Sequence, residues 1–177
     1  RRRCWSACAA AGVEARSATR SSYAPCNSLG LILSMRLLVP VDLSVVSERV
    51  VDAAASLARV YDADLWLLHV TDPDPGELQR ADAPSAARDE MAHEHRADHR
   101  ALQALARGLR EQGLRATALM VQGPIDLCIL REAKQLNADM IVMATHGHGA
   151  MFDLFVGSVS RAILQVSRIP VLMVPGR

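Results

Sequence analysis

The chain has few aromatic residues, few cysteines beyond its first 34 residues and no long hydrophobic run. Only 3% of its 177 residues are aromatic, so the sequence offers no stacking platform for nucleic-acid bases. No apolar run approaches the roughly 18 residues that a membrane-spanning helix needs. The 10 glycines and 8 prolines show no period, which excludes a collagen-like repeat. With 50% hydrophobic residues, the composition predicts a soluble globular chain with one domain.

Charge and cysteine are divided unevenly along the chain. Residues 1–34 contain five arginines and one glutamate, a net charge of +4; the whole chain carries +1, which leaves −3 for the remainder. This mildly acidic body has no basic stripe, so we expect no nucleic-acid partner. Cys128 is the single cysteine beyond residue 34. A disulfide framework is therefore excluded for the body, and we interpret Cys128 as a small buried apolar residue.

Residues 1–34 differ from the rest in pattern as well as in charge. They show neither strand nor helix periodicity, and the hydrophobic pattern begins abruptly at Met35. Because the segment is rich in Arg and Ser and poor in acids, one interpretation is an organelle transit peptide. We favour an over-extended or fused translation start, with Met35 as the natural start. The expectation is thus a non-native or disordered leader over residues 1–34 and one domain over residues 35–177.

Short apolar runs alternate with helical patterns after Met35. Five runs are typical of strands buried on both faces of a parallel sheet: residues 36–41, 64–70, 115–121, 138–144 and 169–174. Ser44 is a suitable cap for the first helix, and Pro124 suits the first turn of the third. The longest helix is expected over about residues 85–112, with Gly113 ending it. The last is expected to begin at about Ser158.

This alternation predicts an α/β fold, a single-domain open parallel sheet with helices on both faces. We expect its five strands in the order 3-2-1-4-5. In the last helix, Val159, Ala162, Ile163 and Val166 follow the spacing of an inward-facing stripe. Ligands bind such sheets at the carboxyl ends of the strands, where the winding direction reverses. Function is therefore expected after the first and the fourth strands.

The connection after the fourth strand is long and rich in glycine. Residues 145–157 separate that strand from the last helix, whereas about 2 to 6 residues are usual in α/β units. Gly147 and Gly149 allow the backbone to approach a ligand closely. Gly157 and Ser158 place N–H groups at a helix start, where anions are stabilised. A phosphate group suits this arrangement; the alternative is a glycine-rich turn before an ordinary Ser-capped helix.

The spacing in this connection is similar to a known nucleotide loop. Ala144-x2-Gly147-x9-Gly157-Ser158 resembles the G-x2-G-x9-G-[ST] loop of the universal stress protein family. Other similar segments are Pro40-Val41-Asp42, Leu68-His69-Val70, Gly123-Pro124 and Ile169-Pro170-Val171-Leu172-Met173-Val174. The resemblance covers about residues 35–175, nearly the whole body.

The resemblance implies an adenine nucleotide alpha hydrolase-like fold and a cytoplasmic, ATP-binding regulator of the stress response. It implies a homodimer that pairs through residues 169–174 and ATP as ligand, with or without Mg²⁺. By position, the adenosine would lie against Pro40, Val41, Asp42 and Val70. The ribose and phosphates would lie against residues from the long connection and the helix after it: Ala144, Thr145, His146, Gly147, His148, Gly149, Gly157, Ser158, Val159 and Ser160.

Two departures from the family motif keep other functions open. Ala144 stands in place of the first motif glycine, and His148 stands where Arg or Lys is frequent. An unperturbed histidine is mostly neutral at pH 7, so it would attract phosphate less at pH 7 than towards pH 6, where more of it is protonated. One alternative is a protein of the same fold that binds no nucleotide and acts through protein contacts. Another is a slow ATPase or self-phosphorylating protein that uses Ser158 or Ser160.

Enzymatic and metal chemistry have little support in the sequence. The G-x4-G-K-[ST] motif of P-loop kinases is absent. No nucleophile or orienting carboxylate has a recognisable spacing from His146 and His148. His95 and His99 lie one helical turn apart, a spacing suited to a metal ion, but no third ligand is identifiable. We therefore expect no catalytic residues and no metal ligands.

Overall fold

The computed structural model describes residues 34–71, 85–145 and 157–176. The elements in these ranges all belong to one compact unit over residues 33–177. The expectations for residues 1–33, and for His146, Gly147, His148 and Gly149, lie outside the described residues.

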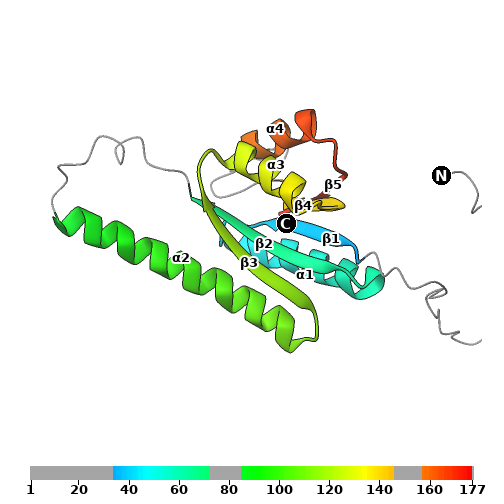
Figure 1. The fold of residues 1–177 in the computed structure, drawn as a ribbon, viewed down its shortest axis with the longest axis horizontal. Helices are drawn as coiled ribbons and strands as arrows, with labels where there is room; N and C mark the ends of the chain where they lie inside the picture. Colours follow the sequence, from blue (N-terminus) through cyan, green and yellow to red (C-terminus); the bar gives the residue numbers. More distant parts are fainter. Residues whose placement is uncertain (1–33, 72–84, 146–156, 177) are drawn as a thin grey trace, which may run out of the picture. The chain divides into compact units, whose positions relative to one another are not determined.

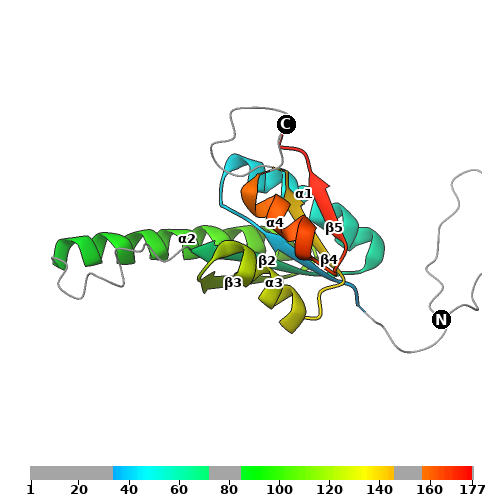
Figure 2. The same cartoon turned by 90° about the horizontal axis from the view of Figure 1, so that it is seen from above.

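Five parallel strands form one sheet, as expected from the apolar runs. They are β1 (Arg36–Pro40), β2 (Asp64–Thr71), β3 (Arg115–Gln122), β4 (Met140–Ala144) and β5 (Val171–Val174). Their order is β3-β2-β1-β4-β5, which confirms the predicted topology. Figure 2 shows β5, in red, beyond β4 at the edge of the sheet.

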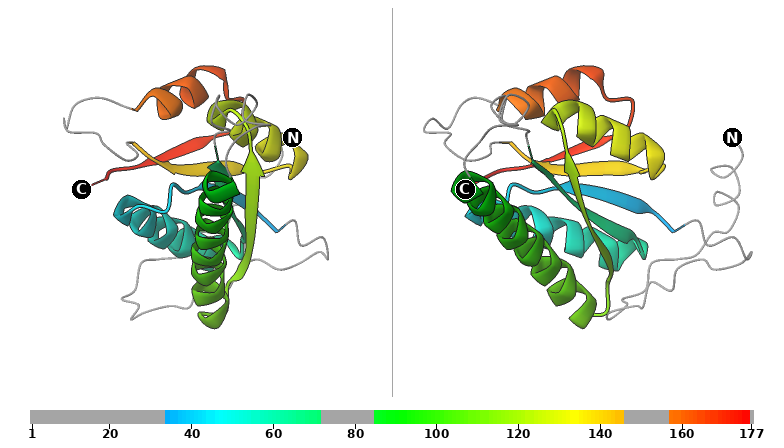
Figure 3. Two further views of the ribbon diagram at one scale, coloured as in Figure 1. Left: turned by 90° about the vertical axis from the view of Figure 1, so that its left-hand side faces the viewer. Right: turned by 60° about the vertical axis from the view of Figure 1, so that its left-hand side comes forward.

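Four helices cover the two faces of this sheet. They are α1 (Val45–Tyr61), α2 (Ser85–Glu111), α3 (Ile125–Gln135) and α4 (Ser158–Val166). Figure 1 shows α3 and α4 side by side, and both views of Figure 3 place them on one side of the sheet with α1 and α2 on the other. Ser44 is the N-cap of α1 and accepts a hydrogen bond from the N–H of Val46, as its position in the sequence indicates.

Each face of the sheet buries its own apolar cluster. Along β1, Leu37 and Val39 pack beneath α1 and α2, whereas Leu38 packs beneath α3 and α4. Ile129 of α3 and Ile163 of α4 belong to the second cluster. Because both faces are covered, the strands are apolar throughout instead of alternating, which is why the sequence showed continuous apolar runs.

Two sequence expectations are wrong in detail. Val166 was expected to face the sheet, but it is 66% exposed. Helix α4 ends at this residue, and the chain turns back towards β5 in an extended conformation at Ser167, so the last position of the stripe is not carried over the sheet. Strands β4 and β5 also begin two residues later than expected, at Met140 and Val171.

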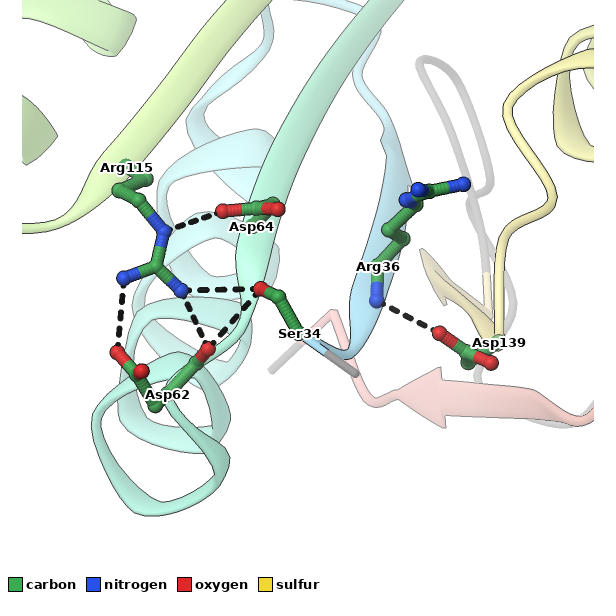
Figure 4. Close-up of polar contacts among 6 residues, drawn as sticks. All are labelled: Ser34, Arg36, Asp62, Asp64, Arg115 and Asp139. Carbon is green, nitrogen blue, oxygen red and sulfur yellow. Dashed lines mark hydrogen bonds and ion pairs between the residues drawn. The ribbon is translucent and has the colours of Figure 1, made fainter. Parts of the chain in front are cut away.

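Charged side chains gather where the strands begin. Figure 4 shows Arg115 between Asp62 and Asp64, with its guanidinium also donating to the Ser34 hydroxyl at 3.0 Å. Nearby, Asp139 accepts a hydrogen bond from the N–H of Arg36 at 2.8 Å. These contacts tie together the amino ends of the strands, so they lie at the opposite end of the sheet from the connections singled out by the sequence.

Within the three described ranges, no helix combines the length and the apolar character needed to cross a membrane.

Candidate functional site

The winding of the sheet reverses between β1 and β4. These strands are neighbours, with Leu37 opposite Met140 and Leu38 opposite Ile141. The helix that follows β1 packs on one face, and the helix that follows β4 packs on the other. Their connections therefore diverge at the carboxyl end of the sheet, which is where open α/β sheets bind ligands.

The Asp42 carboxylate is held in place on the β1 side of this opening. Its Oδ1 atom accepts hydrogen bonds from the Ser44 N–H at 3.1 Å, the Ser44 hydroxyl at 2.6 Å and the Ser47 hydroxyl at 2.7 Å. The N–H of Asp42 donates to the Ser47 oxygen at 3.1 Å. The two serines are buried, whereas Asp42 is exposed. The carboxylate of this exposed residue is thus fixed by its own loop.

Ser47 is a positioning residue that the sequence analysis missed. The signal was present as Asp42-x-Ser44-x-x-Ser47, an acidic residue followed by hydroxyls at the helix cap and three residues later. Leu43, between them, has a φ of 61°. This left-handed conformation is unusual for a leucine. It forms the tight turn that lets both hydroxyls reach one carboxylate oxygen.

The end of β2 supports the neighbouring segment of backbone. The N–H of Val41 donates to the Leu68 carbonyl oxygen at 2.9 Å. The His69 ring donates from Nδ1 to the Val41 carbonyl oxygen, also at 2.9 Å, because a carbonyl can only accept. The other ring nitrogen lies 3.8 Å from a carboxylate oxygen of Asp98 on α2. His69 therefore locks Val41, and next to it Val70 packs on the α3 and α4 face.

Main-chain hydrogen bonds hold the two ends of the long connection together on the β4 side. The Thr145 N–H donates to the Val174 carbonyl oxygen at 3.0 Å, which extends the pairing of β4 with β5. The Gly157 N–H then donates to the Thr145 carbonyl oxygen at 2.9 Å. The connection thus leaves the sheet and returns to it at one place, beside the start of α4.

The start of helix α4 has no side-chain cap for its main-chain N–H groups. Its N-cap is Gly157, which has no side-chain oxygen to cap the helix. The Ser-capped helix considered above is therefore wrong: Ser158 is the first helical residue, and it is exposed. The first intrahelical hydrogen bond runs from the Arg161 N–H to the Gly157 carbonyl oxygen at 2.9 Å. The N–H groups of residues 158–160 precede this ladder and carry the positive end of the helix dipole.

The Ser160 hydroxyl has a structural contact. It donates to the Ala144 carbonyl oxygen at 3.0 Å, and the residue is only 5% exposed. Its proton is therefore engaged in joining α4 to β4. The Ala144 side chain packs against the cluster beneath α1 and α2, on the face opposite to α4. The methyl group that replaces the motif glycine thus points away from the helix start.

The segments after β1 and β4 combine a carboxylate that can accept hydrogen bonds with main-chain N–H groups that can donate to an anion. They offer a fixed carboxylate, apolar backbone segments and an amide-rich helix start, which resemble the parts of a nucleotide site. Among the residues that the structure describes, no three His, Cys, Asp or Glu side chains come together as metal ligands. Expected site residues Pro40, Val41, Asp42, Val70, Ala144 and Thr145 lie at the ends of β1, β2 and β4, and Gly157, Ser158, Val159 and Ser160 lie at the start of α4.

The comparison with families settles which family this arrangement represents. The universal stress protein family model matches residues 34–175. The chain belongs to the universal stress protein family. It is 33% identical over 142 residues to universal stress protein A homolog 1 of Coxiella burnetii, covering 78% of this chain and 94% of that one. It is 27% identical over 153 residues to universal stress protein Sll1654 of Synechocystis, covering 84% and 90%.

Solved structures share the fold of this family member. The protein MJ0577 aligns with a TM-score of 0.66 at 22% identity, over 80% of this chain and 95% of that one. A universal stress protein in complex with cAMP aligns with a TM-score of 0.61 at 19% identity, over 81% and 98%. The universal stress protein of Archaeoglobus fulgidus in complex with dAMP aligns with a TM-score of 0.55 at 19% identity, over 78% and 96%.

Proposed function

We propose that this universal stress protein binds an adenine nucleotide, foremost ATP, at the carboxyl ends of β1 and β4. The observation that carries the proposal is that the Asp42 carboxylate follows β1 and the α4 amides follow β4, two neighbouring strands at the winding reversal. Two structures of the same fold were solved with cAMP and dAMP, and this supports an adenine nucleotide as the ligand class.

Different residues are proposed to contact the adenine, the ribose and the phosphates. Val41 and Val70 offer apolar surface and backbone groups for the adenine. The Asp42 carboxylate, held by Ser44 and Ser47, is an acceptor for the ribose hydroxyls. The N–H groups of residues 158–160 and the Ser158 hydroxyl donate to phosphate oxygens. Micromolar affinity requires about −8 kcal/mol, which an adenine contact and a few charge-assisted hydrogen bonds can supply.

The replacement of the motif glycine by Ala144 is compatible with this proposal. The Ala144 methyl group packs on the face of the sheet covered by α1 and α2, and the Ala144 carbonyl oxygen accepts a hydrogen bond from the Ser160 hydroxyl. The close approach of α4 to β4 is thus made through a carbonyl group, which any residue supplies. Because the Ser160 proton is engaged there, Ser158 is the better candidate for a direct hydroxyl contact with phosphate.

We propose further that the protein is a homodimer that reports nucleotide occupancy in a stress response. Strand β5 is the outer strand next to β4, and its Leu172 side chain is 37% exposed. An edge strand with apolar side chains is a template for pairing with a second copy. Thr145, at the start of the connection from β4 to α4, donates its N–H to the Val174 carbonyl oxygen of β5. The proposed dimer edge is therefore linked by one hydrogen bond to the start of the proposed ligand-binding connection.

Calorimetric titration of the full chain tests the nucleotide site. ATP, AMP and cAMP are titrated in separate experiments with Mg²⁺ present, and saturable binding of about one nucleotide per chain is expected. Ser158→Asp puts a negative charge at the phosphate position, while the helix dipole compensates its effect on folding. We expect it to weaken ATP binding at least tenfold, which is roughly the loss of one charge-assisted hydrogen bond.

The matched control is Leu127→Asp, which adds the same charge in the first turn of α3 at an exposed position. It should leave ATP affinity unchanged. Absence of heat and of any thermal shift at millimolar ATP overturns the nucleotide proposal and favours a family member that acts through protein contacts alone. Release of phosphate or transfer of label to Ser158 from γ-labelled ATP instead identifies the slow ATPase or self-phosphorylating alternative.

A further inference from the structure

A groove of about 580 Å³ lies between α1 and the second half of α2. It is on the face of the sheet opposite to α3 and α4, as both views of Figure 3 show for the two helices. None of residues 157–160 lines it. The groove is therefore separate from the phosphate-binding part of the nucleotide site, and its size falls in the range of roughly 300–1,000 Å³ that small-molecule sites occupy.

Small residues on α2 create the hollow. The lining includes three small residues at helical spacing, Ala101, Ala104 and Gly108. The larger Leu105 and Leu109 beside them form an apolar wall of the groove. A Cβ atom added at Gly108 would meet no other atom within 4 Å. A glycine inside a helix costs about 1 kcal/mol of stability relative to alanine, and the backbone at Gly108 is not in the left-handed conformation that would require glycine. Gly108 thus keeps open a space that the fold does not fill.

Two carboxylates form the polar rim on the α1 side. Glu48 and Asp52 are one helical turn apart, both line the groove and both are exposed. Within the described residues, no hydrogen bond or ion pair engages either carboxylate. None of the described residues that line the groove is a Lys or Arg. Among these described residues, the charge of the rim is therefore negative.

The groove has a different character at its other end. Gln112, which follows α2, also lines it, and its side-chain oxygen accepts a hydrogen bond from the guanidinium of Arg59 near the end of α1. The positive charge of Arg59 is thus set at the end of α1, whereas the two free carboxylates lie in its first two turns. An elongated ligand with one charged end would be oriented by this difference.

We propose that the groove binds a small amphipathic cation, an apolar body that carries a protonated amine. The apolar body lies along Val51, Leu105 and Leu109, and the ammonium group lies between Glu48 and Asp52. Charge complementarity selects a cation, because the same carboxylates repel phosphates and carboxylic acids. Ser44 and Ser47, which hold Asp42, also line one end of the groove. The cation site nevertheless goes beyond the nucleotide proposal, because it requires neither Asp42 nor a bound nucleotide.

The test uses two fluorescent probes that share a dansyl body and differ in the charge of the chain end. Dansylcadaverine ends in an ammonium group, and N-dansyl-6-aminohexanoic acid ends in a carboxylate. With the full chain and no added nucleotide, we expect saturable enhancement of fluorescence by dansylcadaverine and at least tenfold weaker binding of the acid. Equal binding of both probes, or no saturable signal from dansylcadaverine up to about 1 mM, overturns the proposal.

Variants then locate the bound probe. Gly108→Leu adds a side chain whose Cβ atom would meet no other atom within 4 Å, and it improves helix propensity, so the fold should be retained and dansylcadaverine binding lost. Arg107→Leu adds the same side chain at the adjacent exposed position, outside the lining, and should keep the binding. Retained binding in Gly108→Leu, with the fold verified by circular dichroism, places the probe elsewhere and contradicts the proposal.

The carboxylates are tested by the double variant Glu48→Gln with Asp52→Asn. Exposed charge pairs contribute modestly, so a loss of roughly 3- to 10-fold in dansylcadaverine affinity is expected. The loss should shrink at high salt, because exposed charges are screened. A basic amphipathic helical peptide serves as the competing occupant. If that peptide binds the groove and dansylcadaverine does not, the occupant is a protein helix and the small-molecule proposal is wrong.

Discussion

At the scale of single residues, the least replaceable glycine among those with described surroundings is Gly123, before α3. Its φ is +142°, and a Cβ atom there would lie 2.9 Å from the Cys128 sulfur. The sulfur also lies 3.8 Å from the Gln122 carbonyl oxygen. The pair Gly123-Pro124 was visible in the sequence, but its packing against Cys128 was not, because that contact depends on the fold of the turn.

Gly123→Ala should reduce the free energy of unfolding by about 2 kcal/mol or more, because it combines an unfavourable backbone conformation with a clash against buried sulfur. Denaturant unfolding measures the loss. Gly113→Ala is the control, since φ is also positive there but open space surrounds the added methyl, so only about 1 kcal/mol is expected. Adding Cys128→Ala to Gly123→Ala should recover the part due to the clash. Equal losses at both glycines would contradict this account.

Ser47 is the residue through which Asp42 can be tested without removing its charge. Ser47→Ala deletes the 2.7 Å hydrogen bond from the Ser47 hydroxyl to the Asp42 carboxylate and the 3.1 Å hydrogen bond from the Asp42 N–H to the Ser47 oxygen. If Asp42 binds the ribose, ATP affinity should fall roughly 3- to 10-fold through loss of orientation. Ser56→Ala, which removes an exposed hydroxyl bonded to Asp52 within α1, should not change the affinity. An unaltered affinity in Ser47→Ala would show that the carboxylate does not need this support.

At the scale of elements, the charged residues where the strands begin should make the stability of the fold depend on pH. Burial alone would raise the pKa of Asp64. Hydrogen bonds from Arg115 and Ser34, together with the charge of Arg115, outweigh this effect, so the pKa lies below the usual 3.8. The pKa of Arg115 is raised by its hydrogen bonds with Asp64 and Asp62, so it remains charged. Because the native carboxyl binds a proton less readily than the unfolded one, its contribution to stability is present above pH 3.8 and is lost as the pH falls through its native pKa.

Asp64→Asn should therefore lower the free energy of unfolding at neutral pH by about 1 kcal/mol or less, since the pair is partly exposed. The difference from wild type should stay constant down to about pH 5 and shrink below about pH 4. Urea unfolding over a pH series gives both curves. A difference that grows as the pH falls would have the opposite sign to this assignment.

The elements themselves were largely predictable, whereas contacts between them were not. Ser44 and Gly113 marked helix boundaries correctly because capping and left-handed turns depend on local chemistry. Ser158 also marked the start of α4, but as its first helical residue and not as its cap. The exposed Val166 was not predictable from spacing, since helical periodicity does not tell where a helix leaves the sheet. The structural role of Ser160 was also hidden, because its partner Ala144 is 16 residues away.

At the scale of the whole molecule, the parallel order of the five strands brings together segments that are far apart in sequence. Alternation of apolar runs and helices predicted the doubly wound sheet, and its order makes β1, which Asp42 follows, the neighbour of β4, which precedes α4. The family resemblance added the ligand class. The groove between α1 and α2 could not be predicted, because it arises where small residues of one helix face a neighbour whose position only the tertiary structure specifies.

The proposed dimer is a prediction at this same scale. Static light scattering of the wild-type chain should give about twice its mass of 19.2 kDa. Leu172→Lys places a charge on the exposed edge of β5 and should shift the mass towards one chain, since lysine disfavours pairing of edge strands. Leu127→Lys puts the same charge on α3 and should leave the dimer intact. A wild-type mass near one chain would exclude the dimer.

The central claim is that an adenine nucleotide lies between the end of β1 and the start of α4. An amide-resolved NMR titration of the full chain with ATP tests it most directly, because each backbone N–H reports its own surroundings. The account predicts the largest saturable shifts at Asp42, Val70 and residues 158–160, with little change at Gly108 and Leu109. Shifts confined to the groove between α1 and α2, or no saturable shift at millimolar ATP, would contradict it.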